Sequence, residues 1–212
     1  ESKYIGDLVK MEDSVRGAFG GGRKGNKAFE KNKDYFYLMD KERRQARIEE
    51  GILTKGEENF VKKAFDKEGN FTEAPEGKAL TAISEWNQVV KNRFLDALKK
   101  SMTDAQFENW QSEANVKWLD SKEYITRSLS SRFLQERGGR LDEKVFSETL
   151  GKEIEVYDTK YENTVRKYAL GMAKYTSNVE FFPEYIKIKG HKFKGVTNDI
   201  GNLKAADGGK KV

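Results

Sequence analysis

Four lysines near the C-terminal end of the sequence have the type and spacing to bind a polyanion. Residues 185–189 and 192–196 are predicted to form two strands joined by the turn Gly190-His191, because a two-residue loop that begins with glycine is typical of a β-hairpin. The register of that hairpin places four lysines on one face: Lys187, Lys189, Lys192 and Lys194. Like charges opposite one another are unfavourable, so this face is predicted to contact nucleic acid or an acidic protein surface. The alternative is that the lysines only protect an exposed edge strand from aggregation.

Most of the net positive charge of the chain is contributed by the C-terminal segment that contains these lysines. The 212 residues carry a net charge of +5, and residues 184–212 hold seven lysines against three acidic residues, so this segment contributes +4 of the total. A nearly neutral body with a basic end indicates a contact with polyanions more than an evenly basic chain does. Solubility alone is the other interpretation of such an end.

Residue types that perform catalysis are scarce in this chain. It contains no cysteine and one histidine, His191, which excludes disulfides, thiolate metal sites, cysteine nucleophiles and metal sites built on two histidines. A Ser-His-Asp hydrolase would need His191 as its base, but no G-x-S-x-G motif is present. A metal nuclease would need a carboxylate and a lysine on one strand face, whereas the spacing of Glu184 and Lys187 places them on opposite faces. We therefore expect no catalytic residues, no metal and no cofactor.

Two loops match ligand-binding motifs only in part. The glycine-rich residues 20–27 could present backbone amides to a phosphate, but they lack the residue order of a nucleotide-binding P-loop, so a flexible hinge is expected. Residues 66–77 offer oxygen ligands in the order of a calcium loop. Phe71 and Gly77 stand where such a loop needs a glycine and a bidentate glutamate, so an ordinary polar loop is expected.

The spacing of apolar residues predicts a mainly α-helical protein, a bundle of antiparallel helices with a small C-terminal β-hairpin and a disordered basic tail. Apolar residues make up 36% of the chain and prolines occur only twice, so long stretches lack a helix breaker. The charged residues 40–50 are expected to form a solvated helix face. Helices are predicted over residues 2–19, 34–50, 78–101 and 152–175, and shorter ones at the capping motifs that begin with Thr54, Thr103 and Asp120.

Tyrosines form a seam along the predicted helix 152–175. Tyr161, Tyr168 and Tyr175 fall seven residues apart, and Tyr157 occupies an intervening position of the same heptad pattern. Buried tyrosine hydroxyls need hydrogen-bond partners, so the seam suits a half-wet groove or a subunit interface. Packing inside the monomer is the commoner outcome for such a seam.

Three parts of the chain are predicted from these patterns. Residues 1–26 form an N-terminal helix and a glycine-rich linker, residues 27–183 form the helical body, and residues 184–212 form the basic hairpin and a flexible tail. No run approaches the roughly 20 apolar residues that a membrane-spanning helix needs, and no signal peptide is recognisable. The absence of cysteine suits a reducing compartment.

Residues 139–148, followed by Tyr157, Tyr161, Thr164 and the pair Met172-Ala173, resemble part of the phage Mu F-like minor head proteins. The resemblance covers about 40 residues. It implies a helical virion protein at or near the portal that is associated with packaged DNA and has no cofactor. The family's following segment of Asp, Arg and His has no counterpart in residues 189–194, so no functional residue is carried over.

The sequence therefore predicts a non-enzymatic structural or assembly protein, most simply a phage head component in a virion or in the cytoplasm. Its expected partners are other virion or assembly proteins, with DNA and a second copy of the chain as further candidates, and no membrane contact is expected. The first alternative is a cytosolic nucleic-acid-binding protein that uses the lysine hairpin. The second is a metal-dependent nuclease-like enzyme.

Overall fold

The computed structural model describes residues 2–113, 123, 125, 144–147 and 150–189, and the side chains of this part except those of residues 2–4, 112–113, 145 and 182–189. The mainly helical class is confirmed, with a small two-stranded antiparallel sheet in the C-terminal region. The helical elements are α1 (Ser2–Gly17), α2 (Gly22–Asn32), the 3₁₀ helix η1 (Lys33–Met39), α3 (Lys41–Glu49), α4 (Lys55–Ala64), α5 (Pro75–Ser101), α6 (Asp104–Glu113), the π-helical turn η2 (Glu162–Arg166) and α9 (Lys167–Lys189). The strands are β1 (Lys144–Ser147) and β2 (Lys152–Glu155).

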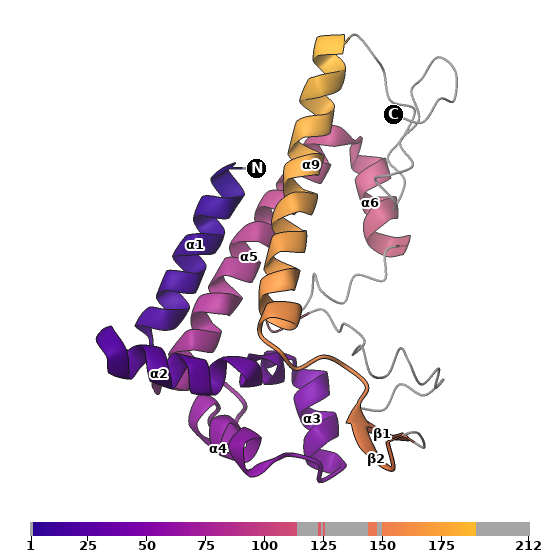
Figure 1. Ribbon diagram of the computed structural model, residues 1–212. Helices are drawn as coiled ribbons and strands as arrows, with labels where there is room; N and C mark the ends of the chain where they lie inside the picture. Colours follow the sequence, from indigo (N-terminus) through magenta and orange to yellow (C-terminus); the bar gives the residue numbers. More distant parts are fainter. Residues whose placement is uncertain (1, 114–122, 124, 126–143, 148–149, 190–212) are drawn as a thin grey trace.

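Helices α1, α5 and α9 pack side by side as a three-helix bundle (Figure 1). Helix α1 runs antiparallel to the other two, whereas α5 and α9 run in the same direction, and α9 continues beyond the N-terminal end of α1. Helices α2, α3 and α4 lie across the lower end of the bundle in this view, and β1 and β2 lie beside α3. The bundle therefore forms one part of the molecule, and its base forms another.

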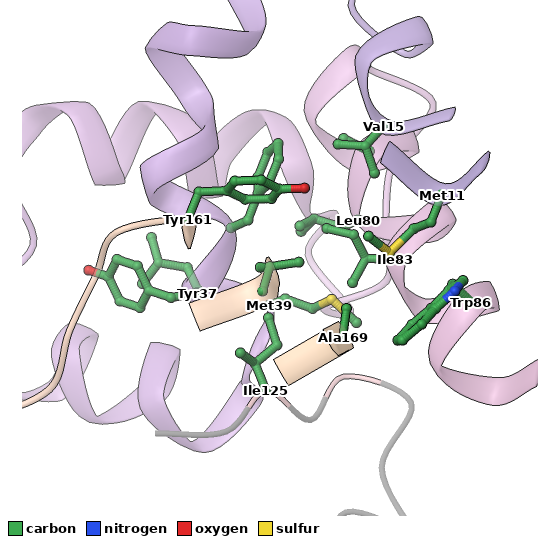
Figure 2. Packing of buried hydrophobic residues seen from close by; sticks show 14 of the residues in the cluster. Met11, Val15, Tyr37, Met39, Leu80, Ile83, Trp86, Ile125, Tyr161 and Ala169 are labelled. Carbon is green, nitrogen blue, oxygen red and sulfur yellow. The ribbon is translucent and has the colours of Figure 1, made fainter. Parts of the chain in front are cut away.

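The longest helix, α5, holds the bundle together through the spacing predicted from the sequence. Its apolar residues recur every three or four positions, and the residues on that stripe are buried: Leu80, Ile83, Val90, Phe94 and Leu98. Leu8, Met11 and Val15 of α1 pack against the first half of the stripe, as Figure 2 shows for Met11 and Val15. Each such aliphatic side chain contributes about 1.5–3 kcal/mol when it is fully buried. A second cluster joins Phe94 and Leu98 to Trp110 of α6 and Val179 of α9.

The flexible hinge predicted for residues 20–27 is wrong, because most of this stretch is the first half of α2. Gly20 and Gly22 adopt φ angles of +82° and +73°, which glycine tolerates far better than other residues, and they turn the chain sharply from α1 into α2. A Cβ at Gly25 would collide with the carbonyl of Gly20, so this glycine lets the turn pack against the helix. The glycines make a tight corner.

The single helix predicted for residues 34–50 is also wrong, because Asp40 interrupts it. Asp40 has extended backbone angles, and its carboxylate accepts a hydrogen bond of 2.9 Å from the amide of Arg43, so it caps the N-terminus of α3. The predicted stop at Gly51 is confirmed by its φ of +66°. The predicted capping box of Thr54 and Glu57 is confirmed at the start of α4.

Two expectations for the C-terminal third are wrong in position. Residues 152–155 pair with 144–147 as β2 and β1, with Val145 opposite Ile154, so the predicted helix 152–175 does not begin until η2. Ile154 is buried between exposed or half-buried neighbours, which is the alternation of a strand. The first predicted strand of the lysine hairpin, residues 185–189, is instead the end of α9, which runs through Pro183. Residues 190–196 lie outside the described part.

Candidate functional site

Helix α3 turns its three arginines into the protein and an apolar residue out of it. The exposed fraction is 2% for Arg43, 7% for Arg44 and 0% for Arg47, whereas Ile48 is 51% exposed. A solvated charged face was predicted for this helix, and for the three arginines that prediction is wrong. We call Arg43, Arg44 and Arg47 the arginine clamp, because each contacts a different segment of the chain.

Arg47 lies between two carboxylates from distant parts of the sequence. Its Nη1 is 2.7 Å from Glu155 Oε2 and its Nη2 is 3.2 Å from Glu155 Oε1, a bidentate pair that joins α3 to β2. Its Nη2 also donates to Glu57 Oε1 of α4 at 3.2 Å. Burial alone would lower the pKa of Arg47, but the hydrogen bond and charge of Glu155, together with the charge of Glu57, raise it. The guanidinium therefore stays charged inside the protein.

Glu57 is the second buried charge of this network. Tyr37 donates its hydroxyl to Glu57 Oε1, and the amide of Thr54 donates to Glu57 Oε2 at 2.7 Å. Burial would raise the pKa of Glu57, but the hydrogen bonds from Tyr37 and Thr54 and the charge of Arg47 outweigh burial and hold it below its usual value. Burial beside this carboxylate raises the pKa of the Tyr37 hydroxyl. Glu57 is thus ionised and Tyr37 neutral at ordinary pH.

The other two clamp residues bind backbone carbonyls. Arg43 donates to the carbonyls of Tyr157 and Asp158 at 3.3 and 3.0 Å, and its guanidinium lies 4.1 Å from the ring centre of Tyr37. Arg44 donates to the carbonyls of Leu38 and Met39 at 2.8 and 3.1 Å. Its guanidinium lies 3.8 Å from the ring centre of Phe65 and within 3.5 Å of Glu123. Burial lowers the pKa of Arg44.

The arginine clamp is a structural device. Its guanidinium groups donate to carboxylates and carbonyls of η1, α4, β2 and the segment that leads to η2, so the positive charge is used to hold these pieces together. In the part of the chain that the structure describes, no three His, Asp or Glu side chains lie close enough to hold a metal ion. The sequence offered one signal for the clamp: Arg43 and Arg47 are one turn apart and follow the cap Asp40 and the aromatic Tyr37.

The predicted tyrosine seam is divided between the interior and the half-buried surface. Tyr157 and Tyr161 are buried, and Tyr161 packs edge-on against Phe29 and Phe36 in the core, where Figure 2 shows it. Its hydroxyl has no hydrogen-bond partner among the described residues. Tyr168 and Tyr175 are half-buried on α9, and Tyr175 stacks on Phe94 with ring centres 5.0 Å apart. A subunit interface at these tyrosines stays a prediction.

The predicted lysine face is not assembled in the described residues. Lys187 and Lys189 belong to the last turn of α9, so the strand face that was to align them does not form. Lys192 and Lys194 lie outside the described part of the chain. A nucleic-acid contact of these four lysines remains a prediction. Within the described ranges no helix is long and apolar enough to cross a bilayer.

Neighbouring apolar side chains of α1 and α9 remain in contact with solvent, as do single apolar residues elsewhere in the described part of the chain. Ile5 and Val9 of α1 are 51% and 50% exposed, and Leu170 of α9 is 46% exposed. We call the surface formed by Ile5, Val9 and Leu170 the α1–α9 face. The sequence carried a signal for it, because the apolar stripe of residues 4–15 is broader than one core-facing side of a helix.

Comparison with known proteins found no match: no family model, no curated protein and no solved structure matches this chain.

Proposed function

We propose that this chain is a non-enzymatic structural or assembly protein that works by binding another protein chain. The observation that carries the proposal is the α1–α9 face, where three aliphatic side chains on two neighbouring helices remain about half exposed. The same helices bury Leu8, Val15 and Ala169 in the core, so they have apolar residues left over for a second contact.

The arginine clamp supports the same role. It uses three buried cations to fix the base of the molecule, with contacts from α3 to β2 and to the carbonyls of residues 157 and 158. Buried ion pairs add little net stability compared with apolar packing, but breaking one is costly, so they favour one arrangement of the chain over others. A component that must present fixed surfaces to its neighbours benefits from such a base.

The finer proposal is a component of a phage virion at the head or portal, which follows from the resemblance to Mu F-like minor head proteins. Its partners would be other virion or assembly proteins. The competing proposal is a nucleic-acid-binding protein that uses the basic C-terminal residues, of which Lys187 and Lys189 end α9. The two proposals differ in what the isolated chain binds.

A salt titration of double-stranded DNA binding separates these proposals. The samples are the full chain and a full-length variant in which Lys187, Lys189, Lys192 and Lys194 are replaced by glutamine. An assembly protein predicts weak DNA binding that is the same for both. Binding that depends on these lysines, with a log–log salt slope of about −4 for roughly four neutralised phosphates, would establish the nucleic-acid role instead.

A further inference from the structure

The α1–α9 face has a fixed register because one ion pair ties the two helices together. Glu12 Oε1 of α1 lies 3.1 Å from the Nε of Arg166, the last residue before α9. The two helices run antiparallel from this pair. Val9 lies three residues before Glu12 and Leu170 four residues after Arg166, so each is about one helical turn above the pair. Val9 and Leu170 therefore stand at the same height on adjacent helices, and Ile5 follows one turn further along α1.

Each of the two helices also carries an exposed glycine next in sequence to a residue of the α1–α9 face. Gly6 lies in the first half of α1 and Gly171 in the first half of α9, both exposed, and a Cβ on either would meet nothing within 4 Å. Glycine is among the poorest residues for a helix interior, and no close contact inside the chain requires it at these positions. Without a side chain, each position lets the backbone of another helix approach closely.

Beside the apolar residues, α1 carries a negative charge and α9 a positive one, so two copies of this surface are complementary in charge. Asp13 follows Glu12 on α1 and Lys167 follows Arg166 on α9, and both side chains are exposed. They stand at nearly the same height, one on each helix. A copy of the molecule rotated by half a turn about an axis parallel to the helices places α1 against α9 of the first copy. Asp13 of each copy then faces Lys167 of the other, and Val9 faces Leu170.

We infer that the α1–α9 face is the contact surface of a homodimer in which α1 and α9 of two copies form an antiparallel four-helix bundle. Every helix in it has antiparallel neighbours, which is the up-down arrangement that four-helix bundles favour. This inference rests on the proposed assembly role and names its partner, a second copy of this chain. A two-fold axis perpendicular to the helices would set α1 against α1 and lose the pairing of Asp13 with Lys167.

Introduced cysteines test the arrangement directly, because the chain contains no cysteine of its own. Two full-length variants, Val9→Cys and Leu170→Cys, are oxidised separately and as an equal mixture after subunit exchange, and cross-linked dimers are separated on a non-reducing gel. The dimer predicts a disulfide in the mixture and several-fold less cross-linking in either variant alone. Cross-linking of Val9→Cys alone that equals the mixture would overturn the inferred axis.

A substitution that introduces charge provides a second test, which does not depend on disulfide geometry. Leu170→Lys should raise the dissociation constant of the dimer at least tenfold in sedimentation equilibrium. The matched control is Val89→Lys on α5, whose side chain is 45% exposed but lies outside the α1–α9 face, and its dissociation constant should stay at the wild-type value. Equal effects of the two substitutions would overturn the inference. The DNA titration tests the assembly role separately, so failure of the dimer is distinguishable from failure of that role.

Discussion

Arg47 and Glu155, 108 residues apart in the sequence, form a bidentate ion pair with N–O distances of 2.7 and 3.2 Å. The pair joins α3 to β2, and Arg43 fixes the carbonyls of Tyr157 and Asp158 a few residues later. The two-stranded sheet of β1 and β2 would be marginal by itself. The arginine clamp therefore holds this sheet, and with it the segment that leads into η2 and α9, on the base of the molecule.

Replacing Glu57 with glutamine should lower the free energy of unfolding by about 3–5 kcal/mol, the usual cost of removing one partner of a buried ion pair. Glu57 supplies one of the carboxylates that pair with Arg47, whose side chain is fully buried. Urea denaturation measures the effect. Glu58→Gln is the control, because Glu58 is exposed in the same turn of α4 and should change stability by less than about 0.5 kcal/mol. Similar losses in the two variants would contradict the clamp.

The contribution of Glu57 should depend on pH. Its pKa in the folded protein is held below the usual value of about 4.3, so the unfolded chain takes up the proton first as the pH falls. The stabilisation is therefore complete above the unfolded pKa and is lost as the pH falls through the folded one. The difference in unfolding free energy between wild type and Glu57→Gln should shrink between about pH 6 and pH 3. A difference that stays constant over this range would rule out a depressed pKa.

Removing the hydroxyl group should lower the stability of the protein at one buried tyrosine and not at another. Tyr37→Phe removes the donor to the Glu57 carboxylate and should cost about 1.5–3 kcal/mol, the range for hydrogen bonds to charged groups. Tyr161→Phe removes a buried hydroxyl that has no partner among the described residues, so it should be neutral or slightly stabilising. Thermal denaturation of both variants makes the comparison. A loss of more than about 1 kcal/mol in Tyr161→Phe would mean that its hydroxyl is satisfied in solution.

The glycine corner between α1 and α2 should tolerate alanine at one position and reject it at another. A Cβ at Gly25 would collide with the backbone of Gly20, so Gly25→Ala should destabilise the protein by about 1–3 kcal/mol. Gly17, at the end of α1, has open space around its Cβ position, and Gly17→Ala should stabilise by up to about 1 kcal/mol through helix propensity. A flexible hinge would instead show the same small effect at both positions.

Local signals in the sequence predicted the parts of the fold that depend on neighbouring residues. The apolar rhythm of α5, the capping box at Thr54 and the stop at Gly51 need only a few adjacent positions, and all three are present. The arginine clamp could not be predicted in the same way, because Glu155, one of the two carboxylates that pair with Arg47, lies 108 residues away. From the sequence alone, Arg43 and Arg47 cannot be distinguished from the charged residues of a solvent-exposed helix.

The position of the sheet was missed for a related reason. Residues 185–189 alternate isoleucine and lysine around a glycine turn, which is a stronger local strand signal than the single buried Ile154 of β2. Helix α9 nevertheless continues to Lys189, because packing of its earlier turns against α1 and α5 extends the helix past the local preference. For the candidate site, the broad apolar stripe of α1 was visible in the sequence, but its pairing with Leu170 depends on the register set by Glu12 and Arg166.

The most direct test of self-association through the α1–α9 face is the mass of the unmodified full chain in solution, measured by sedimentation equilibrium over a range of micromolar concentrations. A single chain has a mass of 24.3 kDa. A dimer formed through this face predicts a reversible approach to twice that mass as the concentration rises. A mass that stays at that of one chain throughout the range would contradict self-association through this face.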